Sequence, residues 1–145
     1  MNIYHSYFKY WRNFEDKKRF TWVAVTKTVP SDYFGCRYMQ LAPIGENFDR
    51  VCSPFDEKKF FIEYARMLKT LDRQTVIDEL KSFSRDGRDV VMLNWEDLTK
   101  NSEGRFAFAW MMGMPMAKAD EYDLKRKIDL ENKQKNNLGD SIFKL

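Results

Sequence analysis

The segment that most constrains the fold is the apolar run that follows Asp89. The next four residues, VVML, are apolar at successive positions, without the alternation of a strand that has one face in water. Such a run is typical of a parallel strand that is covered on both faces. We therefore predict a buried strand over Asp89–Leu93, in a sheet that has helices on both sides.

Two strands and two helices are expected ahead of this run. The segments Ile3–Phe8 and Phe20–Val29 are rich in β-branched and aromatic residues, and a proline ends the second one. One helix is predicted from Asp56 and another from the capping residue Asp72, because apolar residues recur there three and four positions apart. Residues 31–54, rich in Gly, Pro and aromatic residues, are expected to form a long irregular connection.

Strand, helices and strand in this order imply a right-handed parallel crossover. The expected fold class is therefore α/β: a small three-layer Rossmann-like domain over residues 1–117, with a short, mainly parallel sheet flanked by helices. A helix over Phe106–Met112 should pack on that sheet, with the neighbouring methionines as core filler. Residues 118–145 form a C-terminal extension, in which a charged helix over Ala117–Asn137 precedes an apolar tail.

The tail is expected to dock. Its apolar residues would fray in water unless they were held by the domain, by a second copy or by another protein. We therefore predict a protein partner or a homo-oligomer, formed through the C-terminal extension. The predicted docking residues are Ile142, Phe143 and Leu145.

The composition excludes several function classes. With 43% hydrophobic, 16% aromatic and 32% charged residues, the chain is expected to be a globular cytoplasmic protein that does not enter a membrane. The glycines form no phosphate-binding loop and His5 is the only histidine, so neither a metal site nor a cofactor is predicted. His5 is interpreted as a strand residue. Cys36 and Cys52 lack a metal-binding spacing and are expected to be free thiols.

The candidate ligand site follows the apolar run. In an open α/β sheet, ligands bind beyond the carboxyl ends of the strands, and Asn94, Trp95 and Glu96 occupy that place. The following loop leads to Ser102 and Arg105, where helix amides and a guanidinium would form an anion site. These five residues are the predicted ligand-binding set, and Glu96 is the candidate catalytic acid or base. The alternative is that Glu96 and Arg105 only pair with each other and brace the loop.

A second candidate site is the segment from Lys9 to Arg19, where cations are interleaved with aromatic residues although the net charge of the chain is only +3. Such a mixture can bind phosphates and stack on bases. The alternative is a solvated loop whose aromatic side chains pack inward. The candidate nucleic-acid contacts are Lys9, Trp11, Arg12, Lys17, Lys18 and Arg19.

Several segments, taken in order, resemble a known family. NIYHSYF, VAVTKTVPSDYFGCRYMQLAP, FIEYARMLKTLDRQTVIDELKSF and VVMLNWE together resemble the domain-of-unknown-function family 488 over residues 1–117. Family members typically end the third strand in Cys-aromatic-Glu and begin the next helix with Cys-His-Arg. Here Asn94 stands at the first cysteine, and the second motif is replaced by the segment SEGR, which keeps an arginine. The resemblance implies the family's fold and cleft without its reactive cysteines and histidine.

These observations favour a non-catalytic or weakly catalytic binding and interaction module. A small anionic or nucleotide ligand would occupy the cleft, and the C-terminal extension would mediate self-association or partner docking. One alternative is a nucleic-acid-associated protein that acts through residues 9–19. Another is an enzyme that processes nucleotides or nucleic acids, with Glu96 as acid or base and Arg105 as anion clamp. A degenerate domain with a docking tail would also suit a phage or mobile-element protein.

Overall fold

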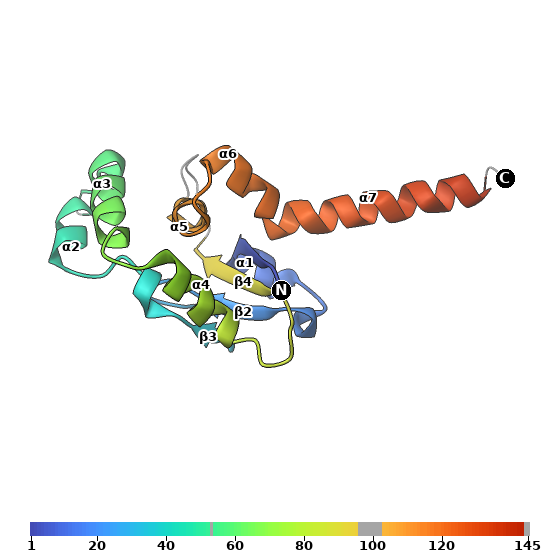
Figure 1. Ribbon diagram of the computed structural model, residues 1–145, viewed down its shortest axis with the longest axis horizontal. Helices are drawn as coiled ribbons and strands as arrows, with labels where there is room; N and C mark the ends of the chain where they lie inside the picture. The colour runs from blue at the N-terminus through green and yellow to red at the C-terminus, as the bar shows by residue number, and fades with distance from the viewer. Residues whose placement is uncertain (53, 96–102, 144–145) are drawn as a thin grey trace.

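The computed structural model describes residues 1–52, 54–95 and 103–143, with the side chains of the last helix described as far as Asn137. The strands form one parallel sheet in the order β1-β4-β2-β3 (Figure 1). The α/β class predicted from the sequence is confirmed. The strand bounds are β1 (Ile3–Tyr7), β2 (Thr21–Ala24), β3 (Cys36–Arg37) and β4 (Val90–Asn94).

Strand β4 is the centre of the molecule. It lies between β1 and β2 and is buried along its whole length. Its first residue, Val90, pairs with Ile3 on one side and Thr21 on the other. The buried strand predicted over 89–93 is confirmed, although it begins and ends one residue later. Its last residue, Asn94, therefore lies at the middle of the carboxyl edge of the sheet.

One face of the sheet packs against most of the helices. Val90 and Met92 belong to the same core cluster as Tyr64, Leu80 and Phe108, which come from three different helices. The helices of this cluster are α2 (Glu46–Cys52), α3 (Glu57–Leu68), α4 (Arg73–Ser82), α5 (Glu103–Met112) and α6 (Met116–Ala119).

Two of these helices begin where the sequence predicted. The carboxylate of Asp56 accepts a hydrogen bond from the backbone amide of Lys59 at 3.1 Å, and that of Asp72 accepts one from Thr75 at 2.9 Å. Each aspartate therefore satisfies an amide that the first turn of its helix leaves without a partner.

The other face is covered by a cluster rich in aromatic side chains. It includes Phe8 and Trp11 from α1 (Phe8–Asn13), and the short 3-10 helix η1 (Lys17–Arg19) leads from α1 back toward β2. Leu124, the first residue of the last helix, is buried in the same cluster. Helices, sheet and aromatic cluster thus form three layers.

The strand predicted over 20–29 is shorter than expected. β2 ends at Ala24, and the backbone amide of Val25 makes one further bond, to the Leu93 carbonyl oxygen at 3.0 Å. The chain then turns away, and the Thr26 hydroxyl donates to the Thr28 carbonyl. The prediction of a wholly irregular connection over 31–54 was also wrong, since it contains β3, α2 and the 3-10 helix η2 (Met39–Leu41).

The prediction of a single charged helix over 117–137 was wrong about where that helix begins. Helix α6 is followed by the 3-10 turn η3 (Asp120–Tyr122), and a new helix, α7 (Leu124–Phe143), begins after it. The Asp123 carboxylate accepts a hydrogen bond from the Arg126 amide at 3.1 Å and so caps the new helix. Helix α7 projects away from the rest of the molecule (Figure 1).

Candidate functional site

The side chain of Asn94 lies on the face of the sheet that α5 covers, and it is only 5% exposed. It contacts the first turn of α5, since a Cβ added to Gly104 would come within 2.4 Å of the Asn94 Oδ1 atom. Neither Oδ1 nor Nδ2 has a hydrogen-bond partner among the described residues. An unpaired buried amide costs about 1–3 kcal/mol. Such groups are therefore places where a ligand or a water completes the hydrogen bonding.

Arg105 reaches toward the C-terminal extension. Its Nε atom lies 2.5 Å from Oδ1 of Asp120, and its Nη2 atom donates to Oδ2 at 3.0 Å. This two-point ion pair joins α5 to η3 and places a carboxylate where the sequence predicted a free anion clamp. The predicted pairing of Arg105 with Glu96 lies outside the described residues, as does Ser102.

Trp95 lies on the opposite side of the sheet from Asn94. Its ring packs edge-on against Phe8 of α1, with centroids 4.8 Å apart, and its Nε1 atom donates to the Thr28 carbonyl at 3.1 Å. The structure therefore brings Asn94 and Arg105 to the α5 side and separates Trp95 from them. The alternation of side chains along a strand was the sequence signal for this separation.

His5 is a residue of β1, as predicted, and it contacts the base of the C-terminal extension. Its Nε2 atom donates to the Ala119 carbonyl at 2.7 Å, and its ring lies 4.9 Å from that of Phe108. Burial lowers the pKa of the imidazole, although the Ala119 carbonyl and the carboxylates of Asp123 and Asp120 oppose that effect. The neutral ring therefore acts as a structural link between the sheet and α6.

The aromatic part of segment 9–19 faces inward. Trp11 is 1% exposed, and its ring packs against those of Tyr33 and Phe34. A buried indole does not offer a face on which a base could stack. The guanidinium of Arg12 pairs with the Asp32 carboxylate through contacts of 2.7 and 3.1 Å.

Two further cations of this segment make structural contacts. The Lys17 ammonium donates to the carbonyl oxygens of Arg12 and Phe14 at the end of α1, where a cation complements the helix dipole. Arg19 binds both carboxylate oxygens of Glu131 in α7, at 2.8 and 3.0 Å. Binding of nucleic acid through this segment, including Lys9 and Lys18, stays a prediction.

The described part of the chain contains no cluster of three or more His, Cys, Asp or Glu residues that could hold a metal ion. None of its helices combines the length and the apolar character needed to cross a bilayer. Cys36 is half-buried and Cys52 exposed, and both are free thiols.

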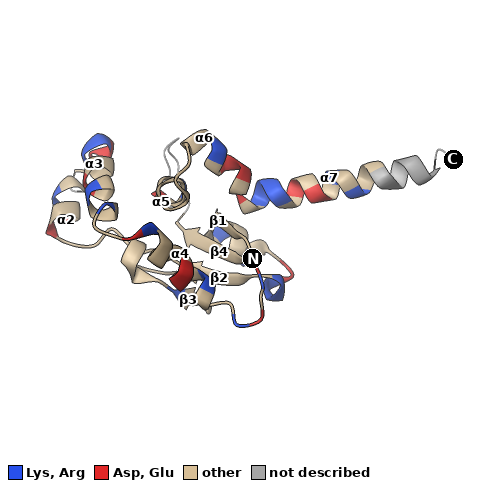
Figure 2. Cartoon of the chain, viewed as in Figure 1, with Lys and Arg blue, Asp and Glu red and all other residues tan. Residues whose placement is uncertain are grey.

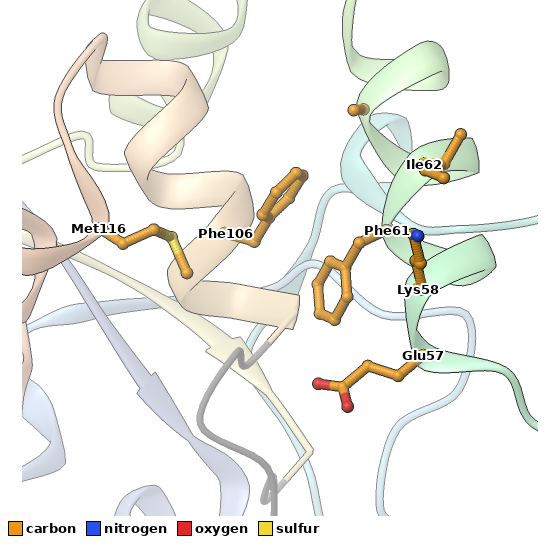
Figure 3. A pocket seen from close by; sticks show the side chains of 7 residues that line it. Glu57, Lys58, Phe61, Ile62, Phe106 and Met116 are labelled. Atoms are coloured by element: carbon orange, nitrogen blue, oxygen red, sulfur yellow. The ribbon is translucent and has the colours of Figure 1, made fainter.

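An apolar groove that was not predicted from the sequence lies beside α5. A hollow of about 620 Å³ lies between α3 and α5, and a second one, of about 470 Å³, shares Phe106 and Met116 with it. Phe61 and Phe106 face each other from the two helices (Figure 3), with ring centroids 5.0 Å apart. The residues that define this α5 groove are Phe61, Ile62, Phe106, Trp110, Met114 and Met116.

The methionines near α5 have two different environments. Met111 is buried in the core, as predicted, whereas Met114 and Met116 are half-buried and line the groove. A signal for the groove was present in the sequence: α5 is apolar around most of its circumference, and one sheet can bury only one side.

Comparison with known proteins gave no match to this chain among family models, curated proteins or solved structures. The resemblance to domain-of-unknown-function family 488 therefore stays a prediction.

Proposed function

We propose that this chain is a binding and interaction module that docks a partner through α7. The observation that carries the proposal is the exposure of residues 132–137, which lie in the part of the helix that projects from the domain (Figure 1). The partner is a second copy of the chain or another protein.

The start of α7 is firmly attached to the domain. Leu124 is buried and Ile128 packs against the same aromatic cluster. Farther along, Glu131 pairs with Arg19 of η1 at 2.8 Å and with Lys127 of its own helix at 2.9 Å. The direction in which α7 leaves the domain is therefore set by the packing of Leu124 and Ile128 and, farther along the helix, by the ion pair of Glu131.

The six residues after Glu131 are exposed to solvent. The segment NKQKNN, residues 132–137, is polar throughout and exposed, although α7 continues to Phe143. A polar helical segment of this length is marginal in water without tertiary packing. Apolar residues return only after it, at Leu138, Ile142, Phe143 and Leu145. A partner that covers the end of α7 would supply the packing that the domain does not.

Deletion of residues 132–145 tests this proposal. We expect the full chain to sediment as an assembly, alone or with a captured protein, and the truncated chain to be monomeric with unchanged domain stability. If the full and the truncated chain had the same assembly state and captured the same proteins, the docking role of α7 would be contradicted.

A second candidate function, the binding of a small anion, is favoured by the amide of Asn94, which has no hydrogen-bond partner among the described residues. This buried side chain contacts the first turn of α5, a helix whose N-terminal amides favour negative charge. Inorganic phosphate should then stabilise the protein against thermal unfolding, and Asn94→Ala should lose that effect. If phosphate stabilised the Asn94→Ala variant as much as the unsubstituted protein, Asn94 would not belong to an anion site.

A further inference from the structure

The α5 groove has the character of a helix-binding surface. Its lining combines aromatic rings with methionines, whose unbranched side chains adapt to an incoming apolar surface. Ile62 is 49% exposed on its rim and adds an aliphatic side chain to this lining. Recognition sites of this kind take the apolar face of an amphipathic helix, through anchors at positions i, i+4 and i+7.

The chain itself contains a segment with that spacing. Leu138, Ile142 and Leu145 stand at i, i+4 and i+7, and α7 runs through the first two of these positions. The residues between and beside them are small or polar except Phe143. We call residues 138–145 the C-terminal anchor.

The anchor cannot fill the groove of its own chain while α7 stays a continuous helix. Helix α3, which forms one wall of the groove, and the far end of α7 lie at opposite ends of the longest axis of the molecule (Figure 1). The residues from 132 to 143 carry the helix roughly 18 Å further from the domain. A second copy is therefore the chain whose groove this anchor can reach.

Groove and anchor each carry charges of both signs. Glu57 and Lys58 line the first hollow and Arg73 the second, where its guanidinium lies 5.3 Å from the centre of the Trp110 ring. The anchor carries Asp140 and Lys144. An orientation that directs Asp140 toward Arg73 and Lys144 toward Glu57 pairs opposite charges at both ends. Figure 2 shows acidic and basic residues on α3 and on the part of α7 that precedes the anchor.

We propose that the C-terminal anchor of one chain binds the α5 groove of a second copy, reciprocally, in a two-fold symmetric dimer. The inference rests on the docking role of α7 and names both the acceptor surface and the partner. Two identical contacts close the assembly, so no unfilled groove or anchor is left to extend a filament.

Matched substitutions test the groove and the anchor separately. Ile62→Glu places a charge in the groove, and Ile44→Glu is its control, since Ile44 is 45% exposed and lies outside the groove. Ile142→Glu changes the anchor, and Asn136→Glu in the exposed segment before it is the control. Far-UV circular dichroism establishes that each variant is folded, and sedimentation equilibrium gives its dimer dissociation constant.

We expect Ile62→Glu and Ile142→Glu each to raise the dimer dissociation constant by about tenfold or more, and the two controls to leave it unchanged. Mixing the two impaired variants should restore association in part. One contact of the mixed dimer joins an intact groove to an intact anchor, whereas the other contact carries both substitutions.

Three results would overturn the inference. They are a monomer at every concentration, a dimer that Ile142→Glu weakens but Ile62→Glu does not, and a mixture of the impaired variants that associates no more strongly than either variant alone. The second result would leave the docking role of α7 intact, because it would show that the anchor binds a different acceptor surface.

Discussion

The amide of Asn94 and the backbone of Gly104 are in direct contact, so that a Cβ at position 104 would lie 2.4 Å from Oδ1 and 2.8 Å from Cγ of Asn94. This contact allows the first turn of α5 to lie on the end of the central strand. It also explains a glycine near the start of a helix, where its conformational freedom is otherwise unfavourable.

We expect Gly104→Ala to lower the free energy of unfolding by about 1–3 kcal/mol, because the new methyl group meets a packed side chain. Helix propensity alone predicts the opposite sign, a gain of about 1 kcal/mol. Urea unfolding distinguishes the two. In an Asn94→Ala background the same substitution should be neutral or stabilising, and additive effects of the two changes would contradict the contact.

The ion pairs of Glu131 should make the base of α7 sensitive to acid. Hydrogen bonding to Arg19, and then to Lys127, lowers the pKa of the Glu131 carboxyl from 4.5 to about 2. Because the folded-state pKa is the lower one, the stabilisation is complete above pH 4.5 and is lost as the pH falls toward 2. Solvent screening limits its size, and we expect Glu131→Gln to cost about 0.5–1 kcal/mol at pH 7.

The control for that experiment is Asp129→Asn, since Asp129 pairs with Lys125 on the exposed side of the same helix. It should change the free energy of unfolding less than Glu131→Gln does. If Glu131→Gln lowered the free energy of unfolding by the same amount at pH 7 and at pH 2, the ion pairs would not be the cause of that loss.

The pKa of His5 should be lower than that of a histidine at the surface. Burial lowers its pKa below 6.5, so the folded protein takes up its proton at a lower pH than the unfolded chain. Stability is therefore complete above pH 6.5 and falls as the pH drops from there toward the folded-state pKa. The charged groups that face the ring are Arg105, Asp120 and Asp123.

As His5 is the only histidine, one NMR titration curve reports it. We expect a midpoint below 6.5 and, in His5→Gln, a flatter stability profile between pH 7 and 5. A midpoint at or above 6.5 would contradict the buried neutral ring.

The parts of the fold that the sequence predicted are those set by local physics. Asp56 and Asp72 cap their own helices, and an uninterrupted apolar run requires a covered strand wherever it occurs. Strand β3 has only two residues and exists because Cys36 and Arg37 pair with β2. That contact between distant segments leaves no pattern in the sequence.

The candidate site was predicted in part. The position of Asn94 at the carboxyl edge follows from strand order. The inclusion of Trp95 in the same predicted ligand-binding set did not take account of the alternation of side chains along a strand. The pairing of Arg105 with Asp120 does not follow from the sequence, because Asp120 reaches Arg105 only after the chain has turned through α6. The α5 groove depends on how α3 and α6 flank one helix, which single-helix periodicity does not contain.

The most direct test of a docking role for α7 is amide hydrogen exchange at residues 132–143, measured from dilute to concentrated protein. We predict rapid exchange in the dilute monomer and protection that increases together with the sedimentation mass, while the amides of β4 stay protected throughout. Exchange at 132–143 that does not change over this range, whether slow or fast, would contradict self-association through α7.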